Sequence, residues 1–133
     1  MDLKVHHIGY AVSDIEKAQK SFESLGYTAC GPVTDDYIRN VKIVFMKTGD
    51  TTVELVAPDG EPNPVDGVLK KNGSTPYHIC YVTDDMNESI QDLKKSGYMV
   101  IKKPEAAPAI DNCNVAFLYS AAAGMIELAE IKE

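Results

Sequence analysis

Two histidines and two glutamates occupy matching places in two copies of one sequence pattern. The run His7-Ile8-Gly9-Tyr10 returns in the second half of the chain as His78-Ile79-Cys80-Tyr81. The run Val53-Glu54-Leu55 returns at nearly the same offset as Ile126-Glu127-Leu128. Imidazole nitrogens and carboxylate oxygens bind divalent nickel, cobalt, zinc, manganese and iron. Two such ligands from each copy predict one divalent ion held by His7, Glu54, His78 and Glu127.

The repetition decides between this metal site and a structural role for each residue. One histidine or glutamate on a strand is usually structural or exposed. A glutamate within an apolar run such as Thr52-Val53-Glu54-Leu55-Val56 is costly to bury unless it is paired or bound to a metal ion. Both copies contain such a glutamate together with a strand histidine, which favours the metal site. Four ligands of this kind leave positions open for water or a substrate in an octahedral shell.

Apolar periodicity predicts the elements that carry these ligands. Residues 4–12 alternate as a strand, with His7 on one face and a helix packed against the other. The box Ser13-x-x-Glu16 predicts the start of that helix, and Gly26 predicts its end. The apolar stripe of the helix comprises Ile15, Ala18, Phe22 and Leu25.

The remaining pattern predicts an α+β fold in which a β-α-β-β-β module occurs twice. In the first copy we expect strands at about 27–33, 40–47 and 51–57, with a turn at 48–50. In the second copy we expect a strand at 76–82, a helix at 85–96 ended by Gly97, and strands at 98–103, 112–119 and 125–131. The prediction is one domain, 1–133, made of module 1 (about 1–57), a connector (about 58–74, with a short helix near 65–71) and module 2 (about 75–133). We predict that the segment 104–112 is a loop that covers the mouth of the cleft in which the four ligands would lie.

Length and composition limit the classes of function. A chain of 133 residues with 44% hydrophobic content can bury a core without disulfides. The formal charge of −7 opposes a nucleic-acid partner, and no apolar run is long enough for a membrane span. Cys30, Cys80 and Cys113 are odd in number and widely spaced, which favours free thiols in a reducing cytoplasm. We therefore expect a cytoplasmic protein with a small-molecule substrate.

The sequence resembles the vicinal oxygen chelate superfamily, which includes glyoxalases, bleomycin resistance proteins and dioxygenases. The phrases that carry the resemblance are His-His-Ile-Gly-Tyr-Ala-Val, Val-Glu-Leu-Val-Ala-Pro, Tyr-His-Ile-Cys-Tyr-Val and Met-Ile-Glu-Leu-Ala-Glu. Bacterial glyoxalase I enzymes look closest. The resemblance implies paired modules that form a U-shaped, incompletely closed barrel sheet around a metal ion, and it implies a homodimer. The ligands of the family map onto His7, Glu54, His78 and Glu127.

The resemblance to glyoxalase I also implies a reaction. A metal-dependent lyase of this type converts the hemithioacetal of methylglyoxal and a thiol into a 2-hydroxyacyl thioester, by proton abstraction and transfer through an enediolate held at the metal. Glu127 is the first choice for the base, and Glu54 is able to act on the other face. Nickel is the leading ion, with zinc, cobalt or manganese as alternatives. Two positions depart from the glutathione-binding pattern of that enzyme. Ala11 occupies the position of an arginine that contacts glutathione, and Pro58 occupies the position of an asparagine.

Two other functions stay open at this point. The opening run and the long connector also resemble methylmalonyl-CoA epimerase, which acts on an acyl thioester. That enzyme usually has an extra glutamate base before the third strand, and the stretch 36–39 here contains none. A non-catalytic binding or resistance protein generally lacks the metal set and often stacks ligands on tryptophan, which this chain does not have. A dioxygenase of this superfamily uses three ligands, so the fourth at Glu54 argues against it.

Arg39 is the only arginine of the chain, and it lies in the same 36–39 stretch near the expected cleft. A guanidinium binds carboxylates and phosphates through two parallel hydrogen bonds, so we predict Arg39 as a substrate-binding residue. His6 is expected to point away from His7 and not to bind the metal. Tyr10, Tyr81 and Phe117 are expected to lie in the core.

Overall fold

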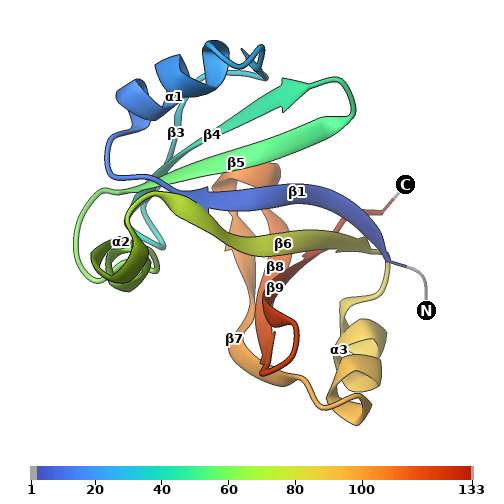
Figure 1. The fold of residues 1–133 in the computed structure, drawn as a ribbon. Coiled ribbons are helices and arrows are strands. Elements are labelled where there is room, and N and C mark those ends of the chain that lie inside the picture. The colour runs from blue at the N-terminus through green and yellow to red at the C-terminus, as the bar shows by residue number, and fades with distance from the viewer. Residues whose placement is uncertain (1–2, 133) are drawn as a thin grey trace. The chain divides into compact units, whose positions relative to one another are not determined.

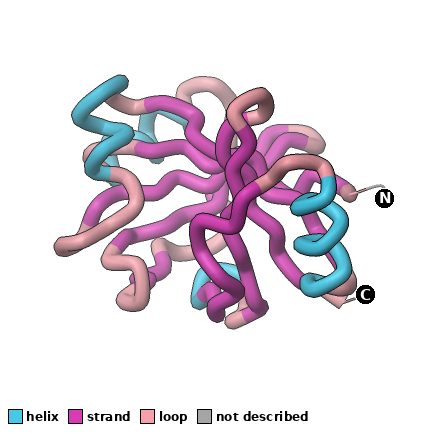
Figure 2. The backbone as a smooth tube through the Cα atoms, turned by 90° about the horizontal axis from the view of Figure 1, so that it is seen from below, coloured by secondary structure: helices cyan, strands magenta, loops and turns pink. Residues whose placement is uncertain are grey.

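The computed structural model describes residues 3–132, and it confirms the mixed α+β class (Figure 1). Strands account for more of the described residues than helices do, and the helices are short (Figure 2). Within the described residues the strands are β1 (Lys4–Ala11), β2 (Thr28–Ala29), β3 (Thr34–Asp36), β4 (Val41–Thr48), β5 (Thr51–Pro58), β6 (Thr75–Thr83), β7 (Met99–Ala107), β8 (Cys113–Ser120) and β9 (Gly124–Glu130). The helices are α1 (Ile15–Glu23), α2 (Asp66–Asn72), α3 (Met86–Lys95) and the 3₁₀ turn η1 (Pro108–Ile110).

The chain divides into two compact units, and the boundary falls inside β1. The first unit is His7–Tyr77, and the second unit joins the residues up to His6 with those from His78 onward. In the first unit the strand order is β2-β4-β5-β1, with β3 paired to β4. In the second unit the order is β6-β9-β8-β7. The predicted modules correspond to these strand sets, whereas a single 1–133 domain and its U shape remain predictions.

Helix α1 of the first unit begins one residue later than the capping box predicts. Its N-cap is Asp14, whose carboxylate accepts a hydrogen bond from the backbone N–H of Lys17 at 3.0 Å. Aspartate at this position satisfies one of the free N–H groups of the first turn and favours the helix electrostatically. Leu25 was wrongly placed in the apolar stripe. The helix ends at Glu23, and Leu25 lies in the following turn with 71% of its surface exposed.

The apolar side of α1 covers one face of the β4–β5 pair. Ile15 is buried in a cluster with residues of β4 and β5, and Ala18 and Phe22 pack against that cluster. The cluster comprises Val12, Ile15, Val44, Met46, Val53, Leu55 and Ala57. Because side chains alternate along a strand, the residues between these, including Glu54, belong to the other face of the sheet.

The strand predicted at 27–33 forms only in part. Residues Thr28–Ala29 pair with β4, the backbone then leaves the sheet, and β3 pairs with the other end of β4. Pro32 lies between the two short strands, and proline cannot donate to a ladder. The β4–β5 turn is shorter than predicted, because Thr48 pairs directly with Thr51 and only the two positions between them remain for the turn. Gly49 adopts φ +56°, a conformation that glycine adopts without steric cost.

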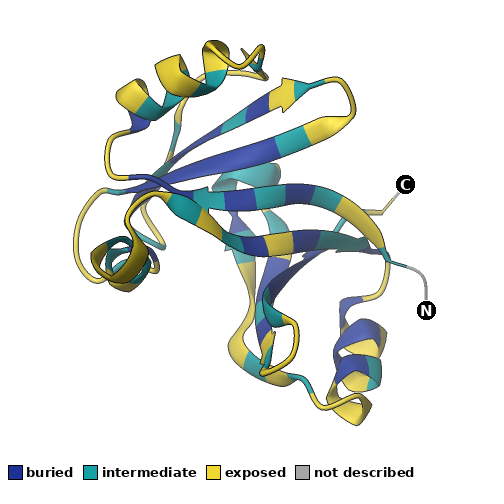
Figure 3. Ribbon diagram, in the orientation of Figure 1, coloured by how far each residue is buried: buried dark blue, intermediate teal, exposed yellow. Residues whose placement is uncertain are grey.

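The second unit repeats this construction around α3. Asp85 accepts a hydrogen bond from the N–H of Glu88 at 3.0 Å, and it is the counterpart of Asp14 in the repeat. The helix packs its apolar side into a second cluster, which comprises Met86, Ile90, Leu93, Ala116, Leu118, Ile126 and Leu128. Figure 3 shows the alternation of buried and exposed residues along β6 and the one-sided burial of α3.

The loop predicted at 104–112 is mostly regular structure. Strand β7 continues to Ala107 through two irregularities in its register with β8, and η1 follows it directly. A register irregularity lets a strand bend while pairing continues. Asp111 and Asn112 then adopt positive φ angles, which aspartate and asparagine tolerate better than most residues. Within residues 3–132, no helix has the length and apolar character needed to cross a membrane.

Candidate functional site

His7 and Glu54 form the half-site of the first unit. His7 lies on β1 with 1% of its surface exposed, and Glu54 lies on β5 with 5% exposed. Nε2 of His7 is 3.3 Å from Oε1 of Glu54. Strands β1 and β5 are parallel neighbours, and Gly9 is the register partner of Glu54, so the histidine and glutamate come from adjacent strands. The structure therefore brings the two predicted ligands of this copy together on a buried face.

His78 and Glu127 form the matching half-site of the second unit. Both residues are buried, and Nε2 of His78 is 3.0 Å from Oε1 of Glu127. Strands β6 and β9 are parallel, and Cys80 is the register partner of Glu127. Cys80 is the counterpart of Gly9 in the sequence repeat, so both half-sites use the same strand register. The sequence repeat is thus a repeat of local geometry.

The separation of the donor atoms suits two ligands of one ion in each half-site. Ligand atoms about 2.1 Å from a metal ion lie about 3.0 Å apart in an octahedral shell and about 3.4 Å apart in a tetrahedral one. The measured separations of 3.3 Å and 3.0 Å match this range. Each of the four residues offers one donor atom of a type that divalent ions accept. The residues present in each unit therefore fit a divalent ion.

A phenylalanine supports the histidine of each half-site. The rings of His7 and Phe45 are nearly perpendicular, with centroids 5.1 Å apart, and those of His78 and Phe117 have centroids 5.4 Å apart. Phe45 lies opposite Glu54 in the β4–β5 register, and Phe117 lies opposite Glu127 in the β8–β9 register. Phe117 is predicted above only as a core residue, and its contact with His78 is not predicted. The return of Phe45 as Phe117 in the sequence repeat could have indicated that both residues contact the histidine of their half-site.

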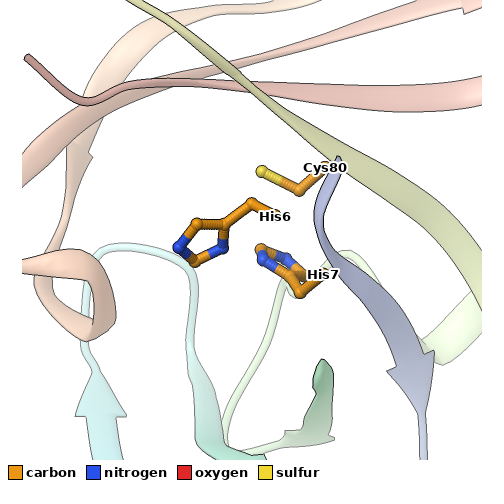
Figure 4. Close-up of side chains that lie close together, drawn as sticks. All are labelled: His6, His7 and Cys80. Carbon is orange, nitrogen blue, oxygen red and sulfur yellow. The ribbon is translucent and has the colours of Figure 1, made fainter. Parts of the chain in front are cut away.

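His6 and Cys80 are neighbours within the second unit. Figure 4 shows their side chains, whose donor atoms lie within 4.8 Å of each other. Cys80 is fully buried, whereas His6 is only partly buried. One nitrogen and one sulfur are fewer protein ligands than metal sites ordinarily use, so we assign no ion to this pair. The prediction that His6 is not a ligand remains a prediction.

The three cysteines differ in environment, although all have free thiols. Cys80 is buried, whereas Cys30 is exposed and Cys113 is intermediate. Burial raises the pKa of the Cys113 thiol above its ordinary value, and the negative charge of Glu127 raises that pKa further. The pKa of Cys113 therefore depends in part on the charge of Glu127 in the second half-site.

Arg39 lies in the first unit and is held by Asp36. Nη1 of Arg39 donates to Oδ2 of Asp36 at 2.9 Å, and Asp36 is 2% exposed. The other oxygen of Asp36 accepts hydrogen bonds from the backbone N–H groups of Ile38 and Arg39, both at 3.1 Å. Because both carboxylate oxygens of Asp36 are engaged, this residue does not supply the base that the stretch 36–39 lacks. The predicted role of Arg39 in substrate binding is developed below.

Comparison with known proteins identifies the family. A family described as the glyoxalase/bleomycin resistance protein/dioxygenase superfamily matches residues 6–117. The chain belongs to this superfamily. A solved structure of a hypothetical protein from Bacillus halodurans shares 31% identity and a TM-score of 0.86, over 100% of this chain and 97% of that one. The fold, including its paired modules, is therefore that of the superfamily.

Two curated relatives narrow the comparison. Bovine mitochondrial methylmalonyl-CoA epimerase is 30% identical over 94% of this chain and 73% of its own length. Ethylmalonyl-CoA/methylmalonyl-CoA epimerase of Cereibacter sphaeroides is 29% identical, over 87% of each chain. Both relatives are named as epimerases of CoA thioesters.

These relatives correct the predicted activity. The prediction of a glyoxalase I-type lyase that detoxifies methylglyoxal is wrong, because the curated relatives that the chain resembles are named as methylmalonyl-CoA epimerases. The error has a physical reason, since two histidines and two glutamates around an ion serve any reaction that removes a proton beside a carbonyl. Ala11 and Pro58, which depart from the glutathione-binding pattern, were the residues that pointed away from glyoxalase I.

Proposed function

We propose that this protein is a metal-dependent epimerase that inverts the 2-position of a substituted malonyl-CoA. The observation that carries the proposal is the buried histidine–glutamate pair found at the same register in each unit, with N···O separations of 3.3 Å and 3.0 Å. The similarity to methylmalonyl-CoA epimerases over 94% of the chain supports the substrate class. His7, Glu54, His78 and Glu127 together supply the ligands of one divalent ion.

The carbon between a thioester carbonyl and a carboxylate loses its proton when the negative charge reaches the carbonyl oxygen. A divalent ion held by the four residues would act as a Lewis acid and stabilise that charge. Glu127 takes the proton from one face of the carbon, and Glu54 returns a proton to the opposite face. Using the two glutamates in this way replaces the additional glutamate that the stretch 36–39 lacks.

The protein environment prepares these glutamates for proton transfer. Each carboxylate is almost fully buried and lies beside an imidazole nitrogen. Removal of water strengthens the electrostatic interactions of the carboxylates, and the perpendicular phenylalanine rings limit the movement of the histidines. Nickel remains the predicted ion, with zinc, cobalt and manganese as alternatives, because this donor set accepts all four.

The proposal is tested by hydrogen exchange at the 2-position. Protein loaded with nickel, zinc, cobalt or manganese is mixed with one stereoisomer of methylmalonyl-CoA in deuterium oxide, and NMR follows loss of the 2-proton while a stereospecific assay follows inversion. We expect both to accelerate only in the metal-loaded samples, relative to metal-stripped protein and to buffer. Failure of every metal-loaded sample to exceed the buffer rate, with methylmalonyl-CoA and ethylmalonyl-CoA alike, would refute the proposal.

A further inference from the structure

The Asp36–Arg39 pair fixes a guanidinium in one orientation at the end of β3. The buried carboxylate of Asp36 accepts one hydrogen bond from the Arg39 side chain and two from the backbone of the following turn. The Arg39 side chain is 17% exposed, so most of it is enclosed while part still reaches solvent. An orientation fixed in advance lowers the entropy that a ligand must overcome when it binds.

Strand register places this pair on the same face of the first unit as Glu54. Asp36 pairs with Val41 across the antiparallel β3–β4 ladder, and directly paired residues share a face. Val41 and Phe45 are four positions apart on β4 and therefore also share a face, and Phe45 pairs with Glu54. Asp36 consequently lies on the face of the half-site, opposite the face that α1 covers. Four strand positions correspond to about 13 Å along β4.

The charges around the pair determine what kind of recognition is available. Asp36 balances the charge of Arg39, and Lys42 lies 2.8 Å from Asp35 and 3.8 Å from Asp59. In both ion pairs the cation is balanced by at least one carboxylate, so neither pair carries a net positive charge that would attract anions from a distance. Recognition by Arg39 must depend on directed hydrogen bonds, which a guanidinium makes with planar or tetrahedral oxyanions. An effect of about tenfold, equivalent to one charge-assisted hydrogen bond, is the appropriate scale.

We propose that Arg39 binds an oxyanion group of the substrate and that Asp36 is the residue that positions it. This inference rests on the proposed function for the identity of the substrate. A malonyl-CoA thioester carries two groups with the required chemistry, the free carboxylate of the acyl part and the phosphates of the CoA part. The register places Asp36, to which Arg39 is hydrogen-bonded, on the ligand-bearing face but does not select between these groups, so the experiment must separate them.

A kinetic comparison of three thioesters separates the two oxyanions. Methylmalonyl-CoA carries carboxylate and phosphates, the methylmalonyl thioester of N-acetylcysteamine carries only the carboxylate, and 2-methylbutyryl-CoA carries only the phosphates. Arg39→Gln should raise KM about tenfold for the substrates that carry the bound group, with little change in kcat, because the lost contact stabilises ground state and transition state alike. Asp36→Asn should raise the same KM values by a smaller factor.

Matched variants distinguish binding from general damage. Lys42→Gln removes a nearby positive charge that is paired with exposed aspartates, and it should leave all three KM values unchanged. If Arg39→Gln lowers the thermal midpoint so far that it does not fold, Arg39→Lys is used, since it keeps the charge but loses the planar fork. Equal KM changes for all three substrates, or no change for any, would overturn the inference.

The single arginine provides a readout that does not require turnover. Because Arg39 is the only arginine of the chain, the ¹⁵N-labelled protein has one Nε–Hε guanidinium signal. Zinc-loaded protein is titrated with methylmalonate and, separately, with CoA. We expect a saturable shift of that signal with one of them, and a weaker shift in Asp36→Asn. If no thioester is turned over, the proposed function fails and the kinetic comparison cannot be made; the inference is then overturned if the guanidinium signal does not move with either probe.

Discussion

The ring of Phe117 stands at 87° to the ring of His78, with the two centroids 5.4 Å apart. Phe117 is also the cross-strand partner of Glu127, so one aromatic side chain adjoins both members of the second half-site. Phe45 has the same relationship to His7 and Glu54. Groups that hold a ligand in its orientation contribute to metal affinity even though they do not touch the metal. The phenylalanines are therefore part of the candidate site.

Replacing Phe117 by leucine tests this role. Leucine keeps an apolar side chain, so the free energy of unfolding should change by less than about 1.5 kcal/mol. The metal dissociation constant should rise roughly tenfold, because His78 loses the ring that limits its movement. Competition with a chromophoric chelator measures the dissociation constant. Phe22→Leu is the matched control, since Phe22 packs against the apolar cluster under α1. Similar metal affinities for both variants would contradict the role of Phe117.

Replacing His7 or His78 by alanine should remove most of the bound metal. Each histidine supplies one nitrogen donor, and loss of one ligand from four weakens binding by several orders of magnitude in typical sites. Elemental analysis after dialysis against a fixed free-metal concentration measures the occupancy. His6→Ala is the control, because His6 is adjacent in sequence but is not assigned to the ligand set. Loss of metal in the His6 variant, with retention in the others, would assign the site to different residues.

The repeat made the pairing of a histidine with a glutamate in each half-site, and most elements, predictable from sequence. A module that recurs at a nearly constant offset shows which residues share an environment, and so the strand of each histidine and glutamate could be assigned. The helix caps show where local signals are ambiguous. Ser13 and Asp14 are both good N-cap residues, and only the structure selects Asp14. Of the predicted strand 27–33 only Thr28–Ala29 forms, because the backbone leaves β4 around Pro32 and pairs with it again only in β3.

Substrate identity could not be derived from the ligands. In the proposed function, His7, Glu54, His78 and Glu127 serve the removal of one proton beside a carbonyl, and that chemistry is shared by enzymes that bind different thiols. In our proposal the substrate is distinguished by groups outside the ligand set, at a strand end where sequence periodicity gives no signal. The pairing of Arg39 with Asp36 is an example, since the turn that joins them has no pattern of its own. The predicted homodimer and cytoplasmic location depend on the resemblance and composition, and both remain predictions.

Cys113 should react with iodoacetamide more slowly than Cys30 at pH 8. Burial and the charge of Glu127 raise the pKa of the Cys113 thiol above its ordinary value of 9.0, so less of the reactive thiolate is present. Cys30 is exposed. Mass spectrometry of the alkylated peptides against time measures both rates. Equal rates for the two cysteines would contradict this prediction.

The same raised pKa makes a small contribution to the pH dependence of stability. The folded state retains the Cys113 proton at pH values where the unfolded state has released it, so the folded state binds more protons above pH 9.0. The free energy of unfolding should therefore decrease as the pH rises through and above that value. Cys113→Ser should flatten this part of the stability profile, measured by denaturant titration at several pH values. An unchanged slope would assign the alkaline loss of stability to other groups.

Replacing Glu127 by glutamine should separate catalysis from metal binding. Glutamine has nearly the same shape and keeps one carbonyl oxygen as a donor, so the metal stays bound with reduced affinity. The amide cannot accept the proton from the substrate, so exchange at the 2-position should fall by at least about 100-fold. Metal content and exchange rate are measured on the same samples at saturating metal. Glu105→Gln, at an exposed position of β7, should leave both unchanged. Exchange at the wild-type rate in the Glu127 variant would remove this residue from the role of base and leave Glu54 as the remaining candidate.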